Sequence, residues 1–119
     1  LRSKPKAAAL VERFFSTNEK VAFRTLEPDQ EEAAFFAGWT RKEAFVKALG
    51  QGLRFPLDRF DVSLSPRDQN ALLRVAGAPE EVNRWSLRDI ELGPDFRAAL
   101  AVELMNTNVA EAISVRFRR

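Results

Sequence analysis

The sequence predicts an α+β domain in which helices pack on one face of an antiparallel sheet. Before residues 50–56, apolar residues recur three and four positions apart, which is typical of amphipathic helices. After that segment they alternate with polar residues, which is typical of strands. Helices followed by strands favour this class over a parallel α/β fold. The chain has 119 residues and no internal repeat, so we expect a single domain over residues 1–119.

Three helices are predicted in the first part of the chain. The first spans Pro5–Phe15, because proline suits a first turn and apolar residues follow four apart. The second covers about 17–26 and begins with Ser16 and Glu19 in the spacing of a capping box. The third runs from the acidic EPDQEE segment to the residue before Gly50, which provides a natural stop.

Five strand segments are expected after the third helix. In the first, polar residues alternate with apolar ones, so Asp61 is expected on an exposed strand face. In WSLRDIEL the apolar alternation shifts phase, which predicts a bulge near Arg88–Asp89 with Asp89 exposed. The APEEVNR segment is expected to be a surface loop. Apolar residues that share one side of a strand are Phe60, Val62 and Leu64; Leu100, Val102 and Leu104; and Ile113, Val115 and Phe117.

Composition excludes several kinds of chemistry. The chain has no cysteine and no histidine, which excludes disulfides, thiol nucleophiles, the usual zinc sites and histidine-based triads. A hard cation such as Mg²⁺ is then the metal that the remaining oxygen ligands favour. The net charge of +2 is no nucleic-acid signature. No apolar run approaches the roughly 20 residues of a membrane span, so we expect neither a nucleic acid nor a membrane as a partner. The absence of cysteine fits a cytoplasmic protein.

The segment WTRKEAFVKALGQGL, at Trp39–Leu53, places charge beside the apolar stripe of the third helix. At 100° per residue, Glu43 lies about 40° and Lys47 about 80° from Trp39, with Lys42 about 60° away on the other side. One interpretation is a Glu43–Lys47 helix pair worth about 0.2–0.5 kcal/mol, with lysine stems covering the edge of the core. The other is an anion and metal site, in which Glu43 holds a divalent cation and the lysines hold phosphate.

This segment resembles the signature of the 4′-phosphopantetheinyl transferases of the surfactin-synthetase-activating type. That signature reads Trp, two residues, Lys-Glu, three residues, Lys, two residues, Gly, one residue, Gly-Leu. The flanking segments RFFSTNE and PLDRFDVSL also resemble the family, so the resemblance spans about Arg13 to Leu64. Every fixed position of the signature is present, at Trp39, Lys42, Glu43, Lys47, Gly50, Gly52 and Leu53.

The resemblance implies an enzyme that transfers 4′-phosphopantetheine from coenzyme A to a serine of an apo acyl or peptidyl carrier protein. By resemblance, Glu43 would ligate Mg²⁺ and help to deprotonate the carrier serine, and Lys47 would contact the coenzyme A phosphates. Lys42 is a weaker candidate for a phosphate or structural role, and Trp39 is expected to pack. The residues do not distinguish fatty-acid, polyketide and nonribosomal peptide synthesis.

The chain departs from the family in one respect. The other metal carboxylates of the family lie in a Gly-x-Asp-x-Glu strand that would precede Leu1, and this chain has no such motif. We therefore expect the C-terminal half of a longer enzyme, one half of a pseudo-dimer with coenzyme A bound between the halves. Two alternatives stay open: a non-catalytic half that acts as a binding module, and self-association into a composite enzyme, against which the absent motif argues.

Overall fold

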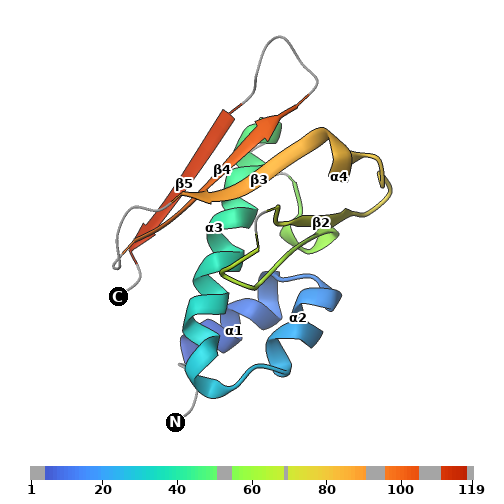
Figure 1. Ribbon diagram of the computed structural model, residues 1–119. Helices are drawn as coiled ribbons and strands as arrows, with labels where there is room; N and C mark the ends of the chain where they lie inside the picture. The colour runs from blue at the N-terminus through green and yellow to red at the C-terminus, as the bar shows by residue number, and fades with distance from the viewer. Residues whose placement is uncertain (1–4, 51–54, 69, 91–95, 105–110, 118–119) are drawn as a thin grey trace.

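The structure is a computed structural model that describes residues 5–50, 55–68, 70–90, 96–104 and 111–117 (Figure 1). It confirms the α+β class, with the strands antiparallel throughout. The long helix α3 (Glu31–Leu49) runs through the molecule, and α1 and α2 pack against its N-terminal half (Figure 1). Among the described residues, no helix is long and apolar enough to cross a membrane.

The helices begin and end where local sequence signals place them. The predicted capping box is confirmed: the Ser16 side chain accepts from the Glu19 amide at 3.2 Å, and the Glu19 carboxylate accepts from the Ser16 amide at 2.8 Å. Gly50 ends α3 in the left-handed conformation, at φ 75°, which glycine adopts without steric cost. The other helical elements are α1 (Pro5–Phe14), α2 (Thr17–Arg24), η1 (Pro28–Gln30), η3 (Leu57–Arg59) and α4 (Glu81–Arg84). The short α4 forms from the last four residues of APEEVNR, which was expected to be a surface loop throughout.

The strands form a two-stranded and a three-stranded antiparallel sheet, in the orders β1-β2 and β3-β4-β5. The predicted bulge near Arg88–Asp89 is wrong, because β3 pairs with β4 in unbroken register from Trp85↔Glu103 to Ile90↔Ala98. The register instead shifts in the first sheet, between Asp61 and Val62. The strands are β1 (Phe60–Val62), β2 (Leu72–Val75), β3 (Trp85–Ile90), β4 (Phe96–Glu103) and β5 (Glu111–Phe117).

The side of β4 that packs on α3 carries small residues. Ala99 and Ala101 are fully buried in the cluster that contains Phe45 of α3. Because side chains alternate along a strand, Leu100 lies on the other side and is half-buried, while Leu104, just after the end of β4, is 53% exposed. The small alanine side chains at this contact let α3 lie close against the three-stranded sheet.

Among the residues that the structure describes, the core consists of two hydrophobic clusters that meet along α3. One lies between the C-terminal half of α3 and the strands and includes Phe45, Phe60 and Trp85. The other lies between the N-terminal half of α3 and the first two helices and includes Phe15 and Phe35. Between the two clusters, α3 contributes three consecutive polar residues that are fully buried, namely Thr40, Arg41 and Lys42. This buried polar layer lies near the start of the signature segment.

Candidate functional site

Three residues of the signature lie on one side of α3. Trp39, Glu43 and Lys47 are one turn apart in succession, which places them above one another. Trp39 and Glu43 are half-buried, whereas Lys47 is exposed. The Trp39 ring meets Phe14 edge-on at 5.8 Å and stacks on Phe35 at 5.8 Å, so it packs α1 onto α3, as expected. A carboxylate and an ammonium group therefore stand beside an anchored aromatic ring at the surface of the helix.

Lys42 has a different environment from the other signature residues. Its side chain is fully buried, and its ammonium Nζ lies 3.0 Å from Glu19 Oε1. The same atom donates to the carbonyl oxygen of Phe60 at 2.7 Å and to that of Leu57, and it lies 3.9 Å above the centroid of the Phe60 ring. Its three donors therefore already have acceptors inside the protein. In this placement the Lys42 ammonium group is held by acceptors of the protein itself, and the phosphate and structural roles given to Lys42 from the sequence both stay predictions.

Glu19 is the buried partner of Lys42, a contact that the sequence analysis missed. Beyond its place in the capping box, its Oε2 accepts from the Val62 amide of β1 at 2.6 Å. The carboxylate is nearly fully buried and meets Lys42 on one side and two backbone amides on the others. Burial raises the pKa of Glu19, and Lys42 and the two amides oppose that increase. Burial lowers the pKa of Lys42, and Glu19 opposes that decrease.

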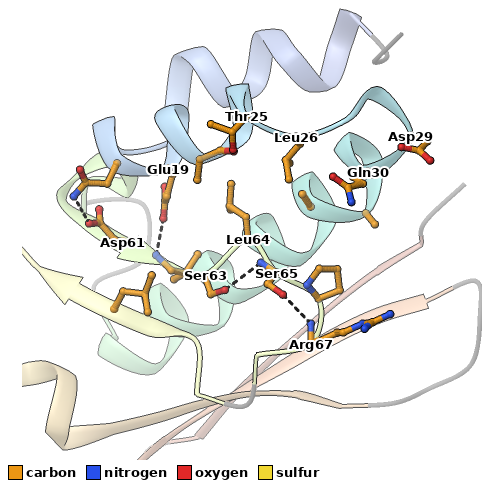
Figure 2. A pocket seen from close by; sticks show the side chains of 17 residues that line it. Glu19, Thr25, Leu26, Asp29, Gln30, Asp61, Ser63, Leu64, Ser65 and Arg67 are labelled. Atoms are coloured by element: carbon orange, nitrogen blue, oxygen red, sulfur yellow. Dashed lines mark hydrogen bonds between the residues drawn. The ribbon is translucent and has the colours of Figure 1, made fainter. Parts of the chain in front are cut away.

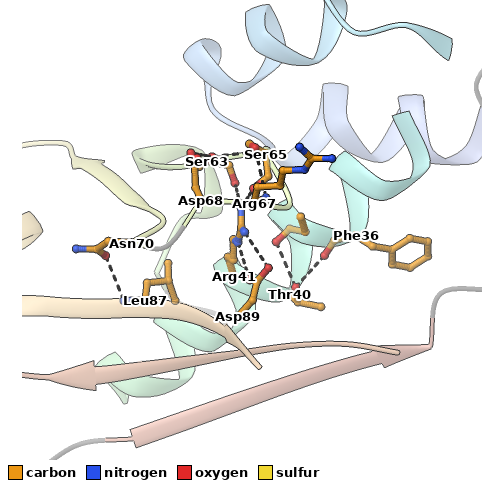
Figure 3. A network of polar contacts seen from close by, with 11 residues as sticks. Phe36, Thr40, Arg41, Ser63, Ser65, Arg67, Asp68, Asn70, Leu87 and Asp89 are labelled. Carbon is orange, nitrogen blue, oxygen red and sulfur yellow. Dashed lines mark hydrogen bonds and ion pairs between the residues drawn. The ribbon is translucent and has the colours of Figure 1, made fainter. Parts of the chain in front are cut away.

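Arg41 forms a second buried network, on the neighbouring face of α3 (Figure 3). Its guanidinium pairs with Asp89 of β3 through two bonds of 2.9 Å, from Nε and Nη2. Its Nη1 donates to the carbonyl oxygens of Ser63 and Ser65, at 2.7 and 2.8 Å. Asp89 is therefore not the exposed residue expected from the sequence, because its carboxylate turns inward to a buried cation. The network joins α3, β3 and the segment after β1.

Asp61 is also buried, where the alternation of β1 predicted an exposed face. Its side chain accepts from Arg74 Nε of β2 at 2.9 Å and from Asn18 Nδ2 of α2 at 2.8 Å. Burial by itself raises the pKa of Asp61, but hydrogen bonds from Arg74, Asn18 and Ser16 outweigh it, so the pKa lies below 3.8. The prediction failed because α2 covers the face of β1 that would otherwise be open to water.

A cavity of about 780 Å³ lies between α2, the start of α3 and the segment after β1 (Figure 2). Ala33 and Ala34 line it from the first turn of α3, and Ala34 precedes Glu43 by nine residues, which is about 14 Å along the helix, so the cavity is at the other end of α3 from Glu43 and Lys47. Neither Glu43 nor Lys47 is among the lining residues. This cavity is therefore separate from the site that the signature predicts.

The donor set of the described residues fits a magnesium ion in part. Glu43 offers a carboxylate at the surface of α3, which is the oxygen ligand that Mg²⁺ prefers. Within the described ranges, however, no three acidic side chains lie close enough together to hold a metal ion. Mg²⁺ normally keeps several waters and substrate phosphates, with one or two carboxylates from protein. Glu43 would thus be one ligand of several.

Comparison with known proteins gives the same family as the signature. The family model of the 4′-phosphopantetheinyl transferase superfamily matches residues 1–101. The chain is 40% identical over 86 residues to the 4′-phosphopantetheinyl transferase psf-1 of Bacillus pumilus, covering 71% of this chain and 36% of that protein. It is 36% identical over 102 residues to the 4′-phosphopantetheinyl transferase HetI of Nostoc sp., covering 86% and 39%. No solved structure gives a significant match.

A third relative shows the same partial coverage. The chain is 31% identical over 99 residues to the 4′-phosphopantetheinyl transferase ffp of Bacillus subtilis, covering 83% of this chain and 42% of that protein. The chain therefore spans about two fifths of the length of these curated relatives.

Proposed function

Since this chain belongs to the 4′-phosphopantetheinyl transferase superfamily, we propose that it takes part in the transfer of 4′-phosphopantetheine from coenzyme A to a serine of an apo acyl or peptidyl carrier protein. The observation that carries the proposal is the complete signature, with Glu43 and Lys47 on the outer side of α3 beside Trp39. A cysteine-free chain fits a reducing compartment, and we place the reaction in the cytoplasm.

Each of the two polar residues has a chemical task in this proposal. The serine oxygen of the carrier attacks phosphorus in the pyrophosphate of coenzyme A, the phosphorus–oxygen bond to the nucleotide breaks, and adenosine 3′,5′-bisphosphate leaves. Lys47, exposed and four residues after Glu43, supplies positive charge to the phosphate oxygens. Glu43 accepts the serine proton and offers an oxygen ligand to Mg²⁺. When bound, Mg²⁺ would neutralise charge on the pyrophosphate.

A second half is part of the proposal. Because the chain spans about two fifths of its relatives, we propose that a preceding N-terminal half supplies the other carboxylates and part of the coenzyme A site. Calorimetric titration of the 119-residue chain with coenzyme A tests this division. Mg²⁺-dependent binding would show that the chain alone holds a usable part of the site, and no binding would support the need for the other half.

The decisive test is Glu43→Gln in the longer protein. Loss of a general base and metal ligand should reduce the rate of carrier modification by about 10²-fold or more. The thermal unfolding midpoint should stay close to wild type, because Glu43 is half-buried at the helix surface. Glu12→Gln, on the exposed Glu12–Arg24 pair, is the matched control. Unimpaired transfer by the Glu43 variant would refute the site, and no transfer by wild type would favour the binding-module alternative.

A further inference from the structure

We propose that Lys42 and Glu19 are a positioning pair that fixes α3 so that Glu43 and Lys47 face the substrate, a role that rests on the function proposed above. Neither member reaches the surface, since Lys42 is fully buried and Glu19 is 2% exposed. The pair lies in the buried polar layer between the two hydrophobic clusters. It would act on the reaction through the helix and not through contact with coenzyme A.

Every donor of the Lys42 ammonium group points to a different part of the chain. One acceptor is Glu19 of α2, and the others are the carbonyl oxygens of Leu57 and Phe60, which lie in η3 and at the start of β1. The Phe60 ring, 3.9 Å away, covers a further side of the cation. An ammonium group has three donors, so this environment satisfies it completely. A phosphate could contact Lys42 only if these bonds were broken.

Glu19 extends the same connection to two further backbone groups. It accepts from the Ser16 amide at the start of α2 and from the Val62 amide of β1. Together, the two side chains join α2, α3, η3 and β1 at one point. Figure 2 shows Glu19 extending from α2 toward β1, with its bond to the Val62 amide drawn as a dashed line.

The directional character of these bonds explains why a polar pair suits positioning. Hydrophobic contacts are non-directional, so the two clusters bury α3 without strictly fixing its rotation about its own axis. Charged hydrogen bonds depend on both distance and angle. Lys42 and Glu43 are consecutive, so any rotation that moves the Glu43 carboxylate also moves the Lys42 ammonium away from its three acceptors. Holding Lys42 therefore holds Glu43.

Stability alone is a weak reason for this pair. Removing two charges from water costs free energy, and replacing a buried ion pair with apolar residues of similar volume is often neutral or stabilising. Removing one member is costly, because the other is left as an unpaired buried charge. A variant that lacks both charges is therefore expected to fold. Any decrease in its rate of carrier modification would then report on the displacement of Glu43 and Lys47.

The test uses the longer protein with Lys42→Met, Glu19→Gln and the double variant. We expect kcat for carrier modification to fall about 10- to 100-fold, the size expected from a displacement of about 1 Å at a reacting group. The KM for coenzyme A should stay within about threefold, because no phosphate contact is lost. The double variant should be no slower than the slower single variant, since coupled residues act as a unit. Where Lys42→Met does not fold, the double variant replaces it.

Controls separate positioning from ligand binding and from the proposed function itself. Arg24→Met removes the exposed Arg24–Glu12 pair and should leave kcat unchanged. Hydrogen exchange at the Val62 amide should be faster in both single variants, a readout that does not depend on turnover. A tenfold rise in KM for Lys42→Met with kcat unchanged would make Lys42 a phosphate ligand and overturn the positioning role alone. Absence of transfer by wild type would overturn the proposed function and this role with it.

Discussion

Replacing Asp89 with alanine removes the carboxylate that neutralises a fully buried guanidinium. The Arg41 side chain is 0% exposed, and its two bonds of 2.9 Å to Asp89 are parallel and bidentate. In Asp89→Ala the two carbonyl bonds to Ser63 and Ser65 remain, but the charge has lost the counterion with which it pairs. Breaking a buried pair in this way costs about 3–5 kcal/mol of the free energy of unfolding. Because the Asp89 side chain is 22% exposed and water reaches this end of the pair, we expect the lower end, about 3 kcal/mol.

Urea denaturation monitored by circular dichroism measures this change. The urea midpoint should fall, while the slope of the unfolding free energy against urea concentration should stay constant. The corresponding decrease in the thermal midpoint is roughly 10 °C for a domain of this size. The Arg41→Met/Asp89→Ala double variant should be less destabilised than the sum of the single variants, because it contains no unpaired charge. Arg24→Met is the matched control, since its exposed pair should contribute under about 1 kcal/mol. An Asp89→Ala variant within about 0.5 kcal/mol of wild type would refute the reasoning and class this pair with surface ion pairs.

Two further predictions concern packing and acid stability. Gly38→Ala should lower the free energy of unfolding by about 1–3 kcal/mol, because the new Cβ would lie 2.6 Å from a Leu64 methyl group and 3.0 Å from the Phe15 ring; an unchanged urea midpoint would contradict this. The Asp61 pKa is lower folded than unfolded, so the stability that this carboxylate contributes is present above about pH 4 and is lost as pH falls through the folded pKa. The stability difference between wild type and Asp61→Asn should therefore shrink as the pH falls below about 4, and a constant difference in urea midpoints would argue against the Arg74 bond as its source.

The helical part of the fold was predictable because its signals are local. A capping box is read over four residues, and the glycine that ends α3 follows the last apolar residue of the stripe. Strand positions also followed from alternation. Alternation could not reveal which side of a strand is covered, and it failed at Asp61, where α2 supplies Asn18 as a partner on the side that was expected to face water.

The signature residues show the same division. Sequence alone assigned Trp39, Glu43 and Lys47 to one side of a helix and related the segment to a transferase family. It placed Lys42 on the other side of Trp39 and left open a phosphate or a structural role, because a lysine beside an apolar stripe is normally exposed at its charged end. The fold instead encloses this lysine between α2 and β1, and its carboxylate partner comes from a different helix.

What the sequence by itself determined is therefore the order of helices and strands, the ends of α3 and the family signature, all of which depend on residues within a few positions of one another. Only the tertiary structure decided which charges are buried and what they meet. Val62 lies 43 positions from Glu19, and Asp89 lies 48 positions from Arg41. Residues so far apart leave no periodic pattern in the chain. They pair only when packing removes both groups from water, because a buried charge is stable only with a hydrogen-bonded partner of opposite charge or polarity.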